Sequence, residues 1–183
     1  MRTLAIAAGT MLITGLLTTS CTESEERVEE DGAAAVPTRS DTRAEASLPD
    51  TTAEAVWAYL RQQDYRESWS LWPGKSRLYA GTEPHGMLLT TYVNEIAHEA
   101  LTRGAVADLP AGSILVKENY MPDSTLAAAT VMYRVDGYNP DHEDWLFAKY
   151  DAQGTAEAFG RAPMCQACHQ QARTGYVYTE VSR

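Results

Sequence analysis

The residues with the clearest chemistry lie near the C-terminus, where Cys165 and Cys168 are followed at once by His169. Two thiols at this spacing can add across the two vinyl groups of haem, and the next residue then presents its imidazole to the iron. The motif therefore predicts one covalently attached haem c, held by Cys165 and Cys168, with His169 as the proximal iron ligand.

Two other uses of a Cys-x-x-Cys pair fit the sequence less well. A redox-active pair of the thioredoxin kind lies at a helix start within a βαβ pattern, whereas this pair follows a series of predicted strands. A zinc site needs a second pair of ligands, and the only other cysteine is Cys21. Haem attachment is therefore the favoured interpretation.

The opposite face of the iron decides what such a haem does. A strong sixth ligand from the protein makes an electron carrier, whereas an open position lets small molecules bind and react. Spacing alone selects no ligand among the candidate side chains, which are His85, His98, His142, Met87, Met121 and Met132.

Among these candidates, His85 has the least ordinary sequence context. It lies in a turn bounded by proline and glycine, and conspicuous loop residues are enriched in functional roles, so a distal or propionate-contacting role is the hypothesis for it. His98 lies on a predicted amphipathic helix and His142 lies among acidic residues, so both are expected in solvent. The methionines are expected to fill a core or pack in loops.

Lys117 follows three apolar residues in a predicted strand over residues 114–120. Alternation along a strand places Lys117 on the same face as Leu115, and Glu118 on the opposite face. Lys117 is either surface charge at an exposed strand edge or a group that faces a site. In the next strand, the three alanines at 127–129 would let a flat macrocycle approach the sheet, or would simply pack tightly.

These residues depend for their positions on a predicted α+β fold, an antiparallel β-sheet with flanking helices. A Thr51-x-x-Glu54 capping box predicts a helix that runs to about Asp64. A short helix is expected over 94–103 and the haem c attachment segment on a C-terminal helix within 160–173, with an extended piece over 176–181. Strands are expected over 87–93, 114–120, 126–135 and 145–150.

The N-terminal part of the chain predicts export. Residues 1–20 combine a basic start at Arg2, an apolar stretch over 4–17 and small polar residues, which is typical of a signal peptide. The residues before Cys21 resemble a bacterial lipoprotein cleavage box, with the leucine four rather than three positions before the cysteine. Cys21 is therefore a candidate for lipidation, and an unlipidated secreted product is the alternative.

Residues 21–50 form an acidic segment without an aromatic residue, and such a segment cannot bury enough apolar surface to fold. We expect a disordered tether that joins a mono-haem domain over 51–183 to the membrane, in the periplasm or cell envelope. The formal net charge of −10 disfavours phosphate-rich partners, so nucleic-acid binding is excluded.

From about Trp69 to the C-terminus the sequence resembles the cytochrome P-460 family, which includes cytochrome c′-beta. The resemblance rests on the motif at 165–169 together with residues 92–94 before a short helix, residues 110–113 leading into Val116-Lys117-Glu118, and the strand near 145–150. The stretch over 78–87 has no assignable match. Phe147 and Tyr133 are candidate pocket walls, and packing in the core is the favoured interpretation for both.

The resemblance implies an antiparallel sheet with helices, a homodimer and a five-coordinate haem that is open on its distal side. In the members called P-460, a lysine of the matching strand is bonded to the porphyrin edge and the proteins oxidise hydroxylamine; the matching residue here is Lys117. In the c′-beta members this bond is absent and the haem binds nitric oxide and related gases.

The favoured function is therefore a haem oxidoreductase of the cell envelope that acts on hydroxylamine or a similar small nitrogen species and passes electrons to a soluble partner. Two alternatives stay open, and with them the question of whether the chain is an enzyme. One is a nitric oxide or gas-binding protein without turnover. The other is a simple electron-transfer cytochrome with a methionine or histidine as the sixth ligand.

Overall fold

The computed structural model describes residues 47–180. The predicted signal peptide, Cys21 and the predicted tether up to residue 46 lie outside the described residues. Just after them, the carbonyl of Pro49 accepts a hydrogen bond from the hydroxyl of Tyr133 at 3.3 Å. Between residues 47 and 180, no helix has the length and apolar character needed to cross a membrane.

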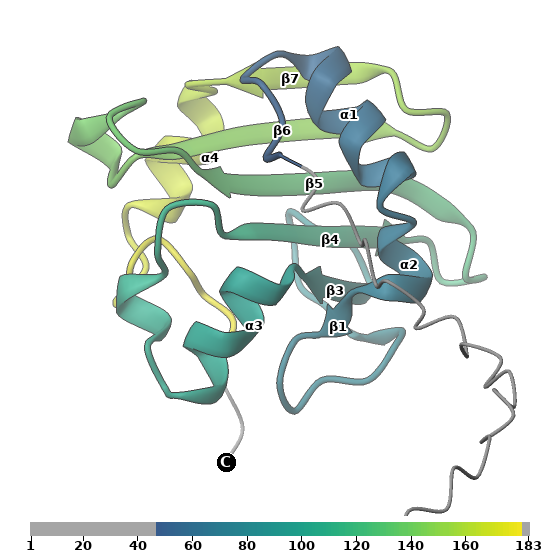
Figure 1. The fold of residues 1–183 in the computed structure, drawn as a ribbon. Coiled ribbons are helices and arrows are strands. Elements are labelled where there is room, and N and C mark those ends of the chain that lie inside the picture. Colours follow the sequence, from purple (N-terminus) through teal and green to yellow (C-terminus); the bar gives the residue numbers. More distant parts are fainter. Residues whose placement is uncertain (1–46, 181–183) are drawn as a thin grey trace, which may run out of the picture. The chain divides into compact units, whose positions relative to one another are not determined.

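A seven-stranded antiparallel β-sheet is the framework of the fold (Figure 1). Its strands lie in the order β1-β3-β4-β5-β6-β7, and β2 also pairs with β3. The strands are β1 Ser70–Leu71, β2 Tyr79–Ala80, β3 Leu88–Val93, β4 Ile114–Tyr120, β5 Leu126–Arg134, β6 Trp145–Asp151 and β7 Ala156–Gly160. The three longest antiparallel pairings place β4 and β5 at the centre of the sheet.

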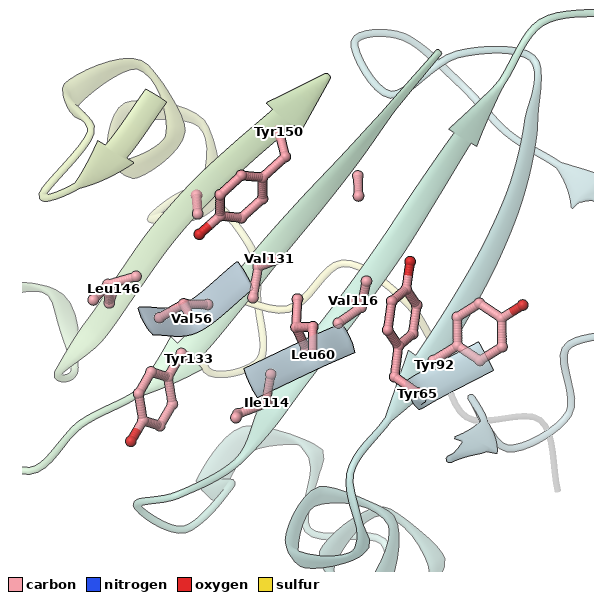
Figure 2. Close-up of a cluster of buried hydrophobic side chains, with 12 residues drawn as sticks. Val56, Leu60, Tyr65, Tyr92, Ile114, Val116, Val131, Tyr133, Leu146 and Tyr150 are labelled. Carbon is pink, nitrogen blue, oxygen red and sulfur yellow. The ribbon is translucent and has the colours of Figure 1, made fainter. Parts of the chain in front are cut away.

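Helices cover both faces of this sheet. The α-helices are α1 Ala53–Gln62, α2 Tyr65–Ser68, α3 Glu95–Thr102 and α4 Pro163–His169, and two short 3-10 helices span Val106–Asp108 and Pro140–His142. Figure 2 shows Val56 and Leu60 of α1 packed over Val116 and Val131 of the central strands. The opposite face packs against α3 and the segment around α4.

Alternation along β4 separates two kinds of environment. Ile114 and Val116 are fully buried in the core beneath α1, and Glu118 shares their face. Glu118 is buried there because it accepts hydrogen bonds from the side chains of Tyr65 and Arg66. Leu115 and Lys117 point to the other face of the sheet, as the strand pattern predicts.

The prediction of an α+β fold with an antiparallel sheet and flanking helices is confirmed, but the helix cap is wrong, and the short elements α2, β1 and β2 as well as β7 are absent from the prediction. The cap of α1 is Thr52 rather than Thr51, because the Thr52 hydroxyl accepts a hydrogen bond from the Ala55 backbone N–H at 3.2 Å. Strand β7 is absent from the prediction because Ala156–Gly160 has only one residue, Phe159, with a strong strand preference. Pairing with β6 forms this strand.

Candidate haem site

His169 is the last residue of α4, and its imidazole is held in one orientation. Nδ1 lies 2.7 Å from the backbone oxygen of Tyr176. A carbonyl oxygen can only accept, so Nδ1 carries the hydrogen and Nε2 keeps a free lone pair. Metal-binding histidines are oriented in this way, by a hydrogen bond from the ring nitrogen that does not bind the metal. His169 is thus prepared to bind a metal through Nε2.

Cys165 and Cys168 are one helical turn apart on α4, and both are free thiols. Both line a cavity of about 500 Å³, which His169 also lines. Burial raises the pKa of the Cys165 thiol. A redox-active Cys-x-x-Cys pair needs the opposite shift, toward the thiolate. The structure therefore disfavours a thioredoxin-like role for this pair.

Three cavities meet around His169. Their volumes are about 50, 500 and 610 Å³, and His85 lines each of them as well. Cys165 lines the first two, and Cys168 lines the last two. The larger two lie within the range of about 300–1,000 Å³ that is typical of small-molecule and cofactor sites.

Lys117 enters this region from the central strand β4. Its neighbours across the sheet are Thr91 on β3 and Thr130 on β5, and it lines the 50 and 610 Å³ cavities. Burial lowers the pKa of its amine, and its positive charge helps to lower the pKa of His169. Lys117 is therefore a group that faces the site, so the interpretation as surface charge is wrong.

His85 approaches the site from the loop between β2 and β3. Its ring centroid lies 6.1 Å from that of His169, with an angle of 80° between the ring planes. Burial lowers the pKa of His85 to about 4, and the charges of Lys117 and His169 add to this shift. The His85 ring is therefore neutral at pH 7 and keeps a lone pair for a hydrogen or a metal.

Of the other candidate residues, some line the cavities around His169 and others lie in the core on the opposite face of the sheet. The ring of Phe147 lies 5.2 Å from that of His169, so Phe147 is a pocket wall. Met132 lines the same 50 Å³ cavity. Tyr133 lies in the opposite core beneath α1, so the favoured interpretation as a core residue is confirmed and Tyr133 is not a pocket wall. The alternation of β5 explains this, because Tyr133 shares a face with Val131 rather than with Met132.

The remaining histidines make no contact with His169 in the described part of the chain. His142 is half-buried, its Nδ1 lies 3.0 Å from the Tyr176 hydroxyl, and it lines none of the three cavities, which agrees with the expectation that it is not an iron ligand. His98 is half-buried on α3. Met87, Met121 and Met164 are exposed, although the last two line the rim of the 500 Å³ cavity.

Two parts of this site were missed from the sequence. One is the backbone oxygen of Tyr176, which carries no signal because every residue has a carbonyl group. The other is Asn119, which lines the 500 Å³ cavity and whose buried Oδ1 has no hydrogen-bond partner in the described part of the chain. The alternation of β4 could have found it, because Asn119 shares a strand face with Leu115 and Lys117.

The turn that carries the Tyr176 carbonyl has no space for a side chain at Gly175, the residue before Tyr176. Gly175 has φ +49°, and a Cβ there would lie 2.6 Å from the carbonyl oxygen of Ala107. Gly175→Ala is expected to destabilise the haem-loaded protein by about 1–3 kcal/mol, because the turn must shift. Displacement of the carbonyl should also change the reduction potential, which a spectroelectrochemical titration measures.

Gly137→Ala is the matched control for this variant. Gly137 also has a positive φ of +68°, but a Cβ there meets nothing within 4 Å. It should cost about 1 kcal/mol and leave the potential unchanged. Equal losses of stability and equal potentials in the two variants would show that the Tyr176 turn has no special role.

The donor set and the space around it fit a haem. The two thiols and His169 Nε2 converge on adjoining cavities of sufficient size, and the sheet contributes small residues, Ala127 and Ala128, to the wall of the 500 Å³ cavity. Within residues 47–180, no group of three or more His, Cys, Asp or Glu side chains is arranged to hold a bare metal ion.

The comparison with known protein families agrees with this geometry. The sequence model of the cytochrome P460 family matches residues 62–179, which include every strand from β1 to β7 and the whole of α4. No curated protein matches the chain. Because the family match covers more than half of the sequence, the chain belongs to the cytochrome P460 family and is a haem-binding cytochrome.

Proposed function

We propose that this protein is a mono-haem c-type cytochrome of the cell envelope that oxidises hydroxylamine or a similar small nitrogen species. Cys165 and Cys168 hold the haem covalently, His169 binds the iron through Nε2, and Lys117 is bonded to the porphyrin edge. The bound haem supplies a redox-active iron at which such compounds bind and lose electrons.

The position of Lys117 is the observation that carries this proposal. Lys117 lines two cavities that His169 also lines. Because burial lowers the pKa of Lys117, more of the amine is neutral than in a solvated lysine. A neutral amine is the nucleophilic form that can bond to a carbon atom. Bonding to a porphyrin carbon replaces one N–H and one C–H bond and removes two electrons and two protons, so maturation requires a two-electron oxidant of the peroxide class. The position and the lowered pKa of Lys117 support this cross-link.

The wall around His169 supports a small, weakly charged ligand. Leu115, Phe147 and Val177 line the 50 Å³ cavity together with His169. Apolar side chains of this kind exclude water and strengthen the few polar contacts that a bound ligand makes. The same wall favours the second candidate function, binding of nitric oxide or a related gas without turnover.

The cellular setting is part of the same proposal. A signal peptide and lipidation at Cys21 would keep the haem domain in the periplasm or at the envelope membrane. Electrons from the substrate then pass to a soluble electron-transfer partner, and the working form is a homodimer. The acidic composition of the chain favours a partner with a basic docking face.

The absorption spectrum of the reduced, periplasmically matured protein tests the proposal. Wild-type protein is expected to show a strongly red-shifted Soret band, because a bond from Lys117 to the porphyrin edge changes the electronic structure of the macrocycle. Lys117→Ala should return the band to the position of an ordinary c-type haem. In the same variant, the rate at which hydroxylamine reduces an added electron acceptor should be lower than in the wild type by at least about tenfold.

Lys149→Ala is the matched control. Lys149, on β6, also lines a cavity of the site, the 500 Å³ cavity, but its side chain is exposed and paired with Glu157. It should keep the red-shifted band. An ordinary Soret band in the wild-type protein would refute the cross-link, and binding of nitric oxide to the ferrous protein without hydroxylamine oxidation would then favour the gas-binding function.

A further inference from the structure

Tyr176 is held by hydrogen bonds at both ends. Its backbone oxygen lies 2.7 Å from His169 Nδ1, and its side-chain hydroxyl lies 3.0 Å from Nδ1 of His142. The rings of His142 and Tyr176 also meet edge to face, with centroids 5.9 Å apart and an angle of 85° between the ring planes. Tyr176 therefore connects the proximal histidine to a second histidine, which comes from the segment between β5 and β6.

The backbone of Tyr176 has a conformation that needs support from other residues. Its φ is +63°, in the left-handed region that residues with a side chain rarely adopt. Such a conformation persists only where surrounding contacts hold it. The Val177 N–H donates to the Thr174 carbonyl at 2.8 Å, and the Thr174 hydroxyl donates to the Val177 carbonyl at 2.8 Å. Residues 174–177 therefore form a closed turn, and contacts with other segments fix its position relative to α4.

The residues after Tyr176 attach one end of this turn. Val177 is buried in the core on the face of the sheet that α3 covers, and the Tyr178 hydroxyl donates to the Cys168 carbonyl at 2.8 Å. The hydrogen bond with His142 acts on Tyr176 itself. Without that bond, the closed turn can tilt about its attachment at Val177 and Tyr178. Such a tilt moves the Tyr176 carbonyl relative to the proximal imidazole.

The segment that carries His142 is anchored to the sheet. His142 ends the 3-10 helix Pro140–His142, and its backbone N–H donates to the Asn139 carbonyl at 2.8 Å. Asn139 is buried, its backbone N–H donates to the Asp144 carboxylate at 3.1 Å, and its side-chain amide donates to the Trp145 carbonyl at 3.1 Å. Trp145 is fully buried at the start of β6. The His142 ring is therefore a fixed partner for the Tyr176 hydroxyl.

His142 lines none of the three cavities around His169, so any effect that it has on the haem passes through Tyr176. We infer that His142 is a positioning residue for the haem: it holds the Tyr176 hydroxyl, and thereby keeps the Tyr176 carbonyl against Nδ1 of His169. The His142–Tyr176 pair thus sets the strength of the bond between His169 and the iron, and with it the reduction potential.

The direction of the effect follows from the chemistry of the proximal imidazole. A hydrogen bond from Nδ1 to a carbonyl makes Nε2 of His169 a more basic ligand. A more basic ligand stabilises ferric iron more than ferrous iron, so the intact pair keeps the reduction potential low. A low potential favours the passage of electrons from the haem to the soluble partner. The inference rests on the proposed function, because it takes His169 as the iron ligand.

Resonance Raman spectra of the ferrous, haem-loaded protein test this role, because the iron–histidine stretching band measures the strength of the proximal bond. Tyr176→Phe removes the hydroxyl, and His142→Leu removes its partner. Each should lower the frequency of the band and raise the reduction potential. The equilibrium between the oxidation states should shift at least about threefold toward the ferrous form, which is about 28 mV for one electron.

Three further variants separate positioning from general damage. His142→Asn keeps a side-chain group that can form the same hydrogen bond, so its band and potential should match the wild type. Tyr138→Phe alters another tyrosine between β5 and β6, whose ring contacts Arg161, and should also match the wild type. The double variant His142→Leu with Tyr176→Phe should shift no more than either single variant, because both remove one bond.

An unchanged band and potential in haem-loaded Tyr176→Phe would overturn the inference, and so would shifts that add in the double variant. The wild-type spectrum decides even if His142→Leu fails to load haem. An iron–histidine band at the frequency of an imidazole without a hydrogen-bond acceptor would show that the Tyr176 carbonyl does not hold His169. The expected shifts in a protein that oxidises no hydroxylamine would refute the proposed reaction and leave the positioning role standing.

Discussion

Cys165→Ala combined with Cys168→Ala is expected to abolish thioether attachment of haem. Each thiol accounts for one thioether bond to the macrocycle, and both line the cavities around His169. The test is made in the Lys117→Ala background, which removes the proposed porphyrin cross-link. Intact mass spectrometry of the denatured protein should then show one added haem when both cysteines are present and none when both are replaced. Haem staining after a denaturing gel should give the same answer.

The two single variants and Cys21→Ala are the controls for this experiment. With one thiol left, a single thioether bond can still form, so each single variant should retain some haem on the denatured chain. Cys21 is the only other cysteine of the sequence, and its replacement should leave the attachment intact. Haem that stays on the denatured double variant in the Lys117→Ala background would mean that a side chain other than Cys165, Cys168 and Lys117 forms the covalent bond.

The sequence was sufficient to predict those features of the site that depend only on neighbouring residues. The motif of Cys165, Cys168 and His169 spans five residues, and it forms a single short helix in the structure. The alternation of β4 also required only neighbouring residues, and it placed Lys117 on the face of the site. Periodic patterns of this kind survive folding because burial of one sheet face stabilises them.

Contacts between distant segments could not be predicted in the same way. His85 and His169 are 84 positions apart, and only the path of the chain around the sheet brings their rings together. The sequence singled out His85 because of its turn, without a partner or a distance. The carbonyl of Tyr176 has no distinguishing side chain at all, although it fixes the orientation of the proximal histidine.

Residue type and local composition describe these positions incompletely. Tyr133 and Phe147 had the same two interpretations, pocket wall or core, and a one-residue change of position along a strand reverses the face to which a side chain points. The acidic neighbours of His142 favoured solvent, and they gave no sign of the Tyr176 hydroxyl, which contacts it from 34 positions away. The neighbours of a residue in the sequence describe its surroundings in the unfolded chain. In the folded protein, residues from distant segments also contact it, and the sequence neighbours do not reveal them.

Glu118→Ala is expected to cause the largest loss of stability among single substitutions on the reverse face of the sheet. The Glu118 carboxylate is fully buried, and it accepts hydrogen bonds from Tyr65 at 2.8 Å, Arg66 at 2.5 Å and Tyr120 at 2.6 Å. Burial and this carboxylate together raise the pKa of both tyrosines, so both hydroxyls stay protonated and act as donors.

Removal of the carboxylate leaves these donors without an acceptor. The loss should be about 3 kcal/mol, because a buried group that loses its partner costs its full desolvation, while the half-exposed Arg66 can regain water. The melting temperature of the haem-loaded protein should fall by about 10 °C. Glu157→Ala breaks the exposed pair with Lys149 and should cost less than about 1 kcal/mol.

The haem spectrum decides whether this loss is confined to the reverse face. Glu118 and Lys117 are adjacent on β4 but point to opposite sides of the sheet, and only Lys117 lines the cavities around His169. Glu118→Ala should therefore lower the melting temperature and leave the Soret band in place, whereas Lys117→Ala should move the band. A Soret shift in a folded Glu118→Ala protein, or a loss no larger than that of Glu157→Ala, would contradict this separation of stability from haem chemistry.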